Sequence, residues 1–564
     1  MKFNDFPYVH MELKPVIHRV QSVISSIESA ADGAALVKAF HELDYLKSEV
    51  FSNAELAAIH HSIDTRDVYW TAENDHYNDI LPVLEEYWQK ANEAVFASAH
   101  VEALKKVVPE TWFAQAQMDR KAFDPAIIPL LQKESKLADE YQSLIASAQI
   151  PFEGGVYTLA QLEKPMKSED RAVRREAVLA YWNWFAGHDE QLGAIYDSLV
   201  SVRDEMARRL GFENYIPLGY LRMHRLDYGH KDVAAYRRQV LEDMVPLAQD
   251  LYRAQARRLG VESLALWDEK VEYLQGDPVP VCEGPEMTER TLAMYRELDP
   301  EVGAFFEMMM ERDLLDLEAR PGKAAGGYCT FVTSYRAPFI FANSNGTEQD
   351  VETLCHEAGH AFQAYSSRNL FPIDCIWPTN ESAEIHSMSM EFFTGPWMEL
   401  FFGERADDYR DMHLAGAVKF LPYGVLVDHF QHEVYGHPQW THQERKACWR
   451  RLEKLYLPHK DYSSCAFLES GGWWMRQLHI FMDPFYYIDY TLAQVAALEF
   501  WQRAQSGDGE AFADYKAICR VGGTLPFRSI MERAHLHVPF EKGCLKQTAR
   551  TVRQYFTKRS QEQR

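Results

Sequence analysis

The stretch TEQDVETLCHEAGHAFQAY, residues 347–365, has the pattern of a single amphipathic helix. Thr347 and Asp350 have the spacing of a helix-capping pattern, which predicts that the helix begins near Glu348. At about 100° per residue, the apolar side chains share one face, and His356 and His360 lie on the opposite face. We therefore expect one face of this helix to pack into a core while the other lines a cleft.

His356, Glu357 and His360 form an H-E-x-x-H motif on this predicted helix. Residues four apart lie on the same face of a helix, so both imidazoles can bind one metal ion. The intervening glutamate can then reach a water molecule at the metal and act as a general base. A chance match is expected about 0.1 times in a chain of this composition, so a catalytic zinc site is the favoured interpretation.

A catalytic zinc ion normally has three protein ligands, and the motif supplies only two. The longer H-E-x-x-H-x-x-G-x-x-H motif is absent, because Gln363 and Ser366 occupy the positions of its glycine and its last histidine. A second predicted helix downstream carries Glu381, Glu384 and Glu391 as candidate ligands. Spacing alone does not choose between Glu381 and Glu384.

These motifs resemble the thimet oligopeptidase and oligoendopeptidase F family of zinc metallopeptidases, and oligoendopeptidase F most closely. In that family, H-E-x-G-H is followed by a downstream glutamate in an E-x-x-S-x-x-x-E pattern. Glu384 and Glu391 match the two glutamates of this pattern. The resemblance implies that His356, His360 and Glu384 bind one zinc ion. It gives Glu391 a supporting or structural role.

Two short strands are predicted immediately before the zinc helix, over residues 326–332 and 339–342. These segments resemble the β-ribbon of the same family, whose edge can pair with a substrate backbone. An extended peptide that adds to a strand edge gains its affinity from main-chain hydrogen bonds. We therefore expect Phe339 and Ile340 to contact the substrate.

His479 and the run from Asp483 to Tyr490 resemble the histidine- and tyrosine-rich substrate segment of the family. Without the resemblance, tyrosines at helical spacing would more often be core residues than functional ones. The resemblance implies that His479 and Tyr490 stabilise the tetrahedral intermediate of peptide hydrolysis. It implies that Tyr486 and Tyr487 bind the substrate.

Helical periodicity dominates the chain up to about residue 320 and predicts a mainly α architecture. The resemblance covers most of the chain, including a Gly-Gly-Thr motif at residues 522–524. It implies a large, two-lobed helical metallopeptidase with a deep substrate channel and a small β-ribbon beside the zinc helix. We expect an N-terminal helical domain at residues 1–165 and a catalytic zinc metallopeptidase domain at residues 166–564.

The chain has 59 Lys and Arg residues against 83 Asp and Glu residues, a net charge of −24. This balance argues against nucleic acid or an anionic membrane as a partner, because both need a basic surface. No run reaches the roughly 18 apolar residues of a membrane helix, and the N-terminus has no apolar signal-peptide region. Eight cysteines without a CxxC pair predict reduced thiols. Together these features predict a cytoplasmic protein.

The preferred functional interpretation is a zinc-dependent endopeptidase that hydrolyses internal bonds of short, unstructured oligopeptides, with one Zn²⁺ per chain. Zinc polarises the scissile carbonyl, and Glu357 takes a proton from water and passes it to the leaving amine. Two alternatives are a zinc exopeptidase of the dipeptidyl carboxypeptidase type and a non-catalytic peptide-binding scaffold. Glu357 argues against the scaffold, because loss of that base is the simplest route to an inactive protein.

Overall fold

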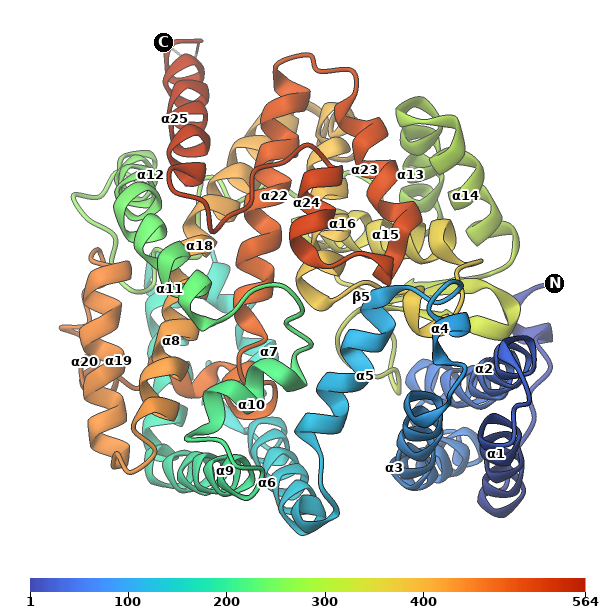
Figure 1. Ribbon diagram of the computed structural model, residues 1–564. Helices are drawn as coiled ribbons and strands as arrows, with labels where there is room; N and C mark the ends of the chain where they lie inside the picture. The colour runs from blue at the N-terminus through green and yellow to red at the C-terminus, as the bar shows by residue number, and fades with distance from the viewer. Residues whose placement is uncertain (563–564) are drawn as a thin grey trace. The chain divides into compact units, whose positions relative to one another are not determined.

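The computed structural model describes residues 1–562, which divide into two compact units (Figure 1). Each unit gathers three separate segments of the chain. The first unit contains Met1–Arg120, Val279–Ala406 and Arg503–Leu536, and the second contains Lys121–Pro278, Asp407–Gln502 and the residues from His537 onward. Helices account for most of both units, which confirms the predicted mainly α fold. The substrate channel and the domain boundary near residue 165 stay predictions.

The first unit begins with three long helices that contact one another pairwise and enclose an apolar core (Figure 1). The third of these helices starts where the Asp67 carboxylate accepts hydrogen bonds from the backbone N–H groups of Tyr69 and Trp70. The helices of this unit are α1 (Leu13–Glu28), α2 (Gly33–Ile63), α3 (Val68–Ala97), α4 (Val101–Leu104), α5 (Glu110–Ala122), α13 (Gly284–Leu298), α14 (Pro300–Glu311), α15 (Glu348–Ser367), α16 (Asn380–Phe393), α17 (Glu399–Phe402), α23 (Ala511–Val521) and α24 (Phe527–Arg533).

A three-stranded sheet lies in the first unit, in the order β3 (Leu315–Glu318), β5 (Ala337–Ser344), β4 (Tyr328–Val332). β5 runs parallel to β3 and antiparallel to β4, with Cys329 opposite Ile340. The two predicted strands correspond to β4 and β5. β3 was not predicted, because four residues are too few to show a periodic pattern. α2 contacts β4, and α15 contacts both β4 and β5.

α15 begins at Glu348, as the capping pattern predicted. The Asp350 carboxylate accepts hydrogen bonds from the backbone N–H groups of Asn345 and Gly346, at 3.0 and 2.7 Å. The Thr347 hydroxyl donates to the Asn345 side chain at 2.7 Å and does not cap the helix. The predicted start is confirmed, although the hydrogen bonds that fix it come from Asp350.

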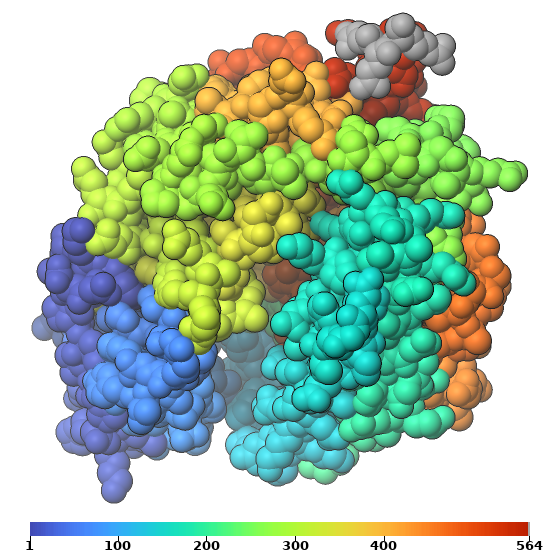
Figure 2. Space-filling view, turned by 180° about the vertical axis from the view of Figure 1, so that it is seen from behind, coloured from blue at the N-terminus to red at the C-terminus, as the bar shows by residue number. Residues whose placement is uncertain are grey.

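The loop between β3 and β4 packs against the C-terminal end of α2. The Thr65 N–H group donates to the Gly322 carbonyl at 2.7 Å, and the Ala324 N–H group donates to the Ser62 carbonyl at 2.8 Å. Figure 2 shows this yellow-green surface against the blue N-terminal helices. The N-terminal helices and the sheet therefore form one continuous body.

The second unit has an aromatic core. The Phe481 ring centroid lies 3.9 Å from that of Tyr141 and 5.6 Å from that of Trp474. A short antiparallel hairpin is formed by β1 (Ile150–Phe152) and β2 (Gly155–Tyr157), and β1 contacts α8. The helices are α6 (Ile128–Ala146), α7 (Leu159–Leu162), α8 (Arg171–Gly187), α9 (Asp189–Arg209), α10 (Tyr215–Arg222), α11 (His230–Gln239), α12 (Val245–Arg258), α18 (Ala406–Gly436), α19 (His442–Tyr456), α20 (Ala466–Glu469), α21 (Leu478–Met482), α22 (Tyr487–Gln505) and α25 (Cys544–Glu562).

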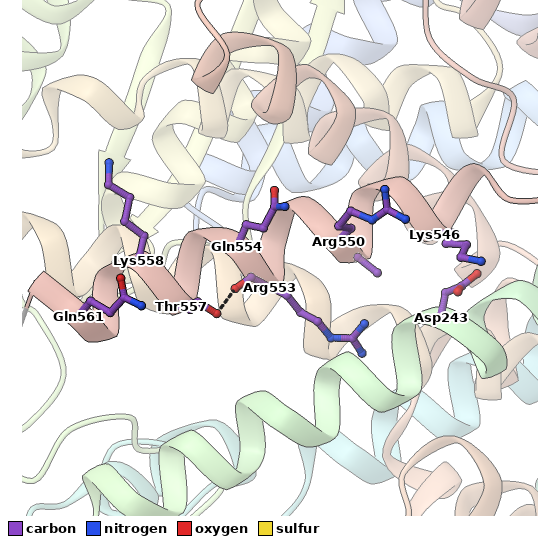
Figure 3. A pocket seen from close by; sticks show the side chains of 9 residues that line it. Asp243, Lys546, Arg550, Arg553, Gln554, Thr557, Lys558 and Gln561 are labelled. Atoms are coloured by element: carbon purple, nitrogen blue, oxygen red, sulfur yellow. Dashed lines mark hydrogen bonds between the residues drawn. The ribbon is translucent and has the colours of Figure 1, made fainter.

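A surface groove of about 540 Å³ follows α25. Figure 3 shows Lys546, Arg550 and Arg553 along the helix, with Asp243 beside Lys546 at one end of the groove. The three basic side chains are exposed. The described residues that line the groove include no histidine and no cysteine, so the groove offers no candidate for the predicted zinc chemistry.

Two observations concern the predictions made from composition. Within residues 1–562, no helix is both long enough and apolar enough to cross a membrane. All eight cysteines are free thiols, and all except Cys329 are buried. Burial raises the pKa of Cys355 to about 12, which keeps this thiol protonated and unreactive.

Candidate metal centre

The side chains of His356, His360 and Glu384 converge within the first unit. The Nε2 atoms of His356 and His360 lie 3.4 and 3.5 Å from the Oε2 atom of Glu384. One donor atom from each of the three residues lies within 4.8 Å of the other two. Atoms bound about 2.1 Å from one tetrahedral ion lie about 3.4 Å apart, so these donors have the spacing of a zinc site.

The two glutamates that spacing could not separate lie in different surroundings. Glu384 carries its carboxylate to the two histidines of α15. Glu381 is buried at the start of α16, where its carboxylate accepts a hydrogen bond from the Thr379 hydroxyl at 2.7 Å. The geometry therefore brings Glu384, and not Glu381, together with the histidines.

Neighbouring side chains orient two of the three donors. His356 Nδ1 lies 2.7 Å from Glu391 Oε1, and this contact directs the Nε2 atom of the same ring toward the cluster. The Ser387 hydroxyl donates to Glu384 Oε2 at 3.0 Å. Sequence reasoning assigned no role to Ser387, although its i+3 spacing from Glu384 on a predicted helix is a usable signal. Glu391 contacts the Nδ1 atom of His356, whereas the Nε2 atom of the same ring lies near Glu384.

Burial and neighbouring charges shift the pKa values of this cluster in different directions. Burial by itself raises the pKa of Glu384, but hydrogen bonds with His356 and His360 outweigh it and lower this pKa below its usual range. Burial lowers the pKa of His356, but the carboxylates of Glu384 and Glu391 outweigh it and raise this pKa. Burial raises the pKa of Glu357 above its usual value. Carboxylates gathered around two imidazoles make the cluster attractive to a cation.

Close packing between α15 and α16 brings the donors together. A Cβ atom on Gly359 would lie 2.6 Å from the His386 carbonyl oxygen and 2.8 Å from the Ser387 Cα atom. Tyr515 of α23 donates a hydrogen bond to the same carbonyl at 2.9 Å. Glycine in a helix costs about 1 kcal/mol relative to alanine. Here it allows a backbone approach that any other residue would prevent.

The Gly522-Gly523 motif supports the segment that leads into α16. A Cβ atom on Gly522 would lie 2.6 Å from the Cys375 carbonyl oxygen, and one on Gly523 would lie 2.4 Å from the Trp377 carbonyl oxygen. Gly522 also has a φ angle of +47°, a region that favours glycine. The half-buried ring of Trp377 has its centroid 6.2 Å from that of His360. No pattern in the sequence predicted that Trp377 lies next to the metal cluster.

Phe339 and Ile340, which were expected to contact a peptide at a strand edge, lie on the central strand of the sheet. Phe339 and Ile340 belong to β5, which lies between β3 and β4 and pairs with both. Their side chains are 1% and 0% exposed. The prediction that these residues present a free strand edge is wrong, because the third strand of the sheet was not visible in the sequence. Within residues 1–562, the edge strands of this sheet are β3 and β4, and α15 contacts β4.

The remaining predicted site residues gather in the second unit, where α21 meets α22. The ring centroid of His479 lies 5.0–5.8 Å from those of Tyr486, Tyr487 and Tyr490. Gln477 Nε2 lies 2.9 Å from His479 Nδ1 and orients the imidazole. All four rings are half-buried. A cluster of phenol and imidazole groups of this kind can donate hydrogen bonds to an anionic group.

Comparisons with known proteins agree with one another. Residues 165–550 match the model of Peptidase family M3, and residues 3–123 match that of the Peptidase M3 N-terminal domain. An oligoendopeptidase F homolog of Borreliella burgdorferi is 21% identical over 391 residues, which span 66% of this chain and 62% of that relative. A crystal structure of a protein assigned as oligoendopeptidase F is 46% identical, with a TM-score of 0.92 and 98% of both chains covered. PZ peptidase A, solved with an inhibitor, is 42% identical, with a TM-score of 0.93 and 99% of both chains covered.

Proposed function

The chain belongs to peptidase family M3, and from this premise we propose that it is a zinc-dependent endopeptidase that hydrolyses internal bonds of short, unstructured oligopeptides. The observation that carries the proposal is the convergence of His356, His360 and Glu384, with 3.4–3.5 Å between the imidazole and carboxylate donors. Catalytic zinc sites combine three such protein donors with one open position. One zinc ion per chain is proposed.

When bound, zinc supplies a Lewis acid that polarises the scissile carbonyl and makes water a good nucleophile near neutral pH. His356, His360 and Glu384 would hold the ion, and Glu391 keeps the His356 ring in its orientation. Glu357 follows His356 on the same helix. It takes the proton from the attacking water and delivers it to the leaving amine.

His479 and Tyr490 are proposed to donate hydrogen bonds to the oxyanion of the tetrahedral intermediate. Preorganised donors stabilise charge that develops in the transition state, and removal of one such donor typically costs about 10²–10³ in kcat. Tyr486 and Tyr487 contact the same imidazole ring. They are proposed to bind the substrate beside the oxyanion.

An extended peptide is proposed to pair with the sheet along the edge of β4 that does not pair with β5. Main-chain hydrogen bonds along a strand edge give affinity with little demand on side-chain sequence. Because α15 contacts β4, such a peptide would lie beside the helix that carries His356 and His360. A folded protein must first unfold to present an extended segment, which costs about 5–15 kcal/mol. Short unstructured peptides are therefore the expected substrates.

The deciding experiment combines metal analysis with an end-blocked, internally quenched peptide. The wild-type protein is expected to carry one zinc ion and to cut this peptide internally. Glu357→Gln should keep the zinc and lose about 10²–10⁴ in turnover, because it removes the general base and no ligand. Glu348→Gln, at the start of the same helix, is the matched control and should keep its activity.

Two results would contradict the proposal. Full activity in Glu357→Gln would remove the general base from the mechanism. Cleavage that requires a free C-terminus, with end-blocked peptides left intact, would identify an exopeptidase in place of an endopeptidase. A native globular protein in the same reaction should stay uncut, as mass spectrometry can report.

A further inference from the structure

Two buried arginines hold the turn that joins α21 to α22. Arg203 of α9 donates from Nη2 to the Phe481 carbonyl at 2.5 Å. Arg225, between α10 and α11, donates from Nη2 to the Phe485 carbonyl at 2.6 Å. Phe481 lies in the last turn of α21, and Phe485 lies two residues before the start of α22. The arginine side chains are 0% and 1% exposed, so neither is available to bind a substrate.

Phe485 has a backbone conformation that is rare outside glycine. Its φ angle is +71°, in the left-handed region. Its N–H group donates to Gln431 Oε1 at 3.1 Å while its carbonyl accepts from Arg225, so buried side chains bind both of its polar groups. Its ring fills a hollow in α10, where a Cβ atom on Gly219 would lie 2.6 Å from the ring. A strained residue persists only where its surroundings fix it, and such residues cluster at functional sites.

Arg225 also ties the turn to the first turn of α22. Its Nη1 group donates to the Asp489 carboxylate and to the Tyr228 hydroxyl. Asp489 is 0% exposed and directly precedes Tyr490 in the chain. One guanidinium group therefore binds the backbone of Phe485 and the side chain next to Tyr490 at the same time.

Stability alone does not account for this buried ion pair. Replacing a buried pair by apolar residues of similar volume often leaves stability unchanged or raises it. What the pair does achieve is a fixed geometry. It holds the strained residue before Tyr486 and the residue before Tyr490 in one arrangement, on the side of α22 that is buried from solvent.

We propose that Arg225 is a positioning residue for catalysis, which sets the directions of Tyr486 and Tyr490 relative to His479 by holding Phe485 and Asp489 together. This inference rests on the proposed function, in which the histidine and tyrosine groups stabilise the oxyanion. Donors aimed at a developing charge must already be in place when the charge appears. A misplacement of about 1 Å can cost about 10²-fold in rate.

Arg225→Lys is the first test, because lysine keeps the charge and loses the forked geometry that reaches Phe485 and Asp489 together. We expect kcat to fall by about 10- to 100-fold, with KM within about threefold and zinc content unchanged. Arg174→Lys is the matched control. Arg174 is equally buried in the second unit, and it also binds a carboxylate, that of Asp268, and backbone carbonyls. Its substitution should leave kcat within about threefold.

Gln431→Met tests the same turn through a different contact. It removes the acceptor of the Phe485 N–H group and alters no buried charge. We expect kcat to fall in the same direction, with KM and zinc content unchanged. This variant decides the question if Arg225→Lys yields too little folded protein to assay.

A double-mutant cycle between Arg225→Lys and Tyr490→Phe separates positioning from general stability. If Arg225 acts through the tyrosine, the double variant should lose no more turnover than the more damaging single variant. Additive losses would overturn the inference, as would a loss of kcat that Arg174→Lys reproduces. If Tyr490→Phe loses turnover while Arg225→Lys and Gln431→Met do not, the inference fails and the proposed function stands. If Tyr490→Phe keeps full turnover, the oxyanion role in the proposed function fails.

Discussion

His356 and His360 converge because they lie four residues apart on one helix, whereas His479 and Tyr490 lie on two helices that are joined by a turn. Helix geometry alone brings the two imidazoles of the metal cluster together. The turn that carries the aromatic cluster is bound by buried side chains from distant parts of the chain, above all Arg225. Donors carried by one helix can be predicted from their spacing, and donors that packing brings together cannot. The geometry of the aromatic cluster should also respond more strongly to distant substitutions than that of the two imidazoles.

Removing the proposed third ligand should have the largest effect and abolish the metal cluster. Glu384→Ala leaves two protein donors, which hold a zinc ion poorly. The chemistry that zinc supplies is worth several kcal/mol, so turnover should fall by about 10³-fold or more. Atomic absorption after gel filtration measures the bound zinc, and the end-blocked peptide measures turnover.

Glu381→Ala is the control for this substitution, because both residues are buried on α16 and only Glu384 meets the histidines. Glu381→Ala should keep its zinc. If Glu381→Ala loses the metal while Glu384→Ala retains it, the ligand assignment is wrong. The metal cluster would then no longer support the comparison with the aromatic cluster.

Tyr490→Phe should have the next largest effect, and it acts on the aromatic cluster alone. It removes one hydroxyl donor and leaves the ring contacts with His479 and Tyr487. We expect kcat to fall by about 10²-fold, the typical cost of one oxyanion donor, with zinc content unchanged. Steady-state kinetics with the quenched peptide tests this, and Tyr486→Phe should cost less because its proposed role is in binding. Equal losses of kcat in both variants would contradict the separate roles.

Glu391→Ala tests whether the contact with His356 supports metal binding. Its carboxylate lies 2.7 Å from His356 Nδ1 and orients the ring. Loss of such a supporting partner typically lowers metal affinity by about 10–100-fold. Turnover should therefore fall at limiting zinc and return to near the wild-type value at saturating zinc. A loss that saturating zinc does not restore would mean that Glu391 has a direct role in catalysis.

The smallest expected effect concerns the ion pair between Glu134 and Arg203, and how much it stabilises the protein in acid. Burial raises the pKa of Glu134, but Arg203 and Arg222 outweigh it and lower this pKa from 4.5 to about 2. A carboxylate whose pKa is lower in the folded state stabilises the protein above pH 4.5, and loses this contribution as the pH falls toward 2. The difference in melting temperature between wild type and Glu134→Gln should be constant near neutral pH and shrink below pH 4.5. Calorimetry at a series of pH values measures it, and a constant difference would contradict the role of the ion pair.

The sequence predicted the metal cluster in large part. The start of α15, the two histidines and the general base follow from capping and from a spacing of four residues. The third ligand needed the family resemblance, because Glu381 and Glu384 are both compatible with spacing. Which of the two glutamates meets the histidines depends on how α16 packs against α15 at Gly359, and spacing does not predict packing.

The sheet and the aromatic cluster were less accessible to prediction. Two of the three strands were predicted, but the order of strands depends on pairing between distant segments, so the free edge was placed on the wrong strand. Arg225 and Asp489 are 264 residues apart in the chain, and no local pattern connects them. The tyrosines were found by resemblance. The residues that hold them were not.

The assembly of each unit from three segments has a consequence for synthesis of the chain. Helices α1 to α4 lie at the N-terminus, yet the first unit is complete only when the segment that ends at Leu536 has been made. At about 5–20 residues per second, the interval between Arg120 and Leu536 lasts about 20–80 s. Until the later segments are made, apolar side chains of the N-terminal bundle that pack against Leu370, Phe371 and Cys375 are exposed on the ribosome. The nascent chain should therefore depend on chaperones that shield its N-terminal bundle until the last helices of this unit emerge.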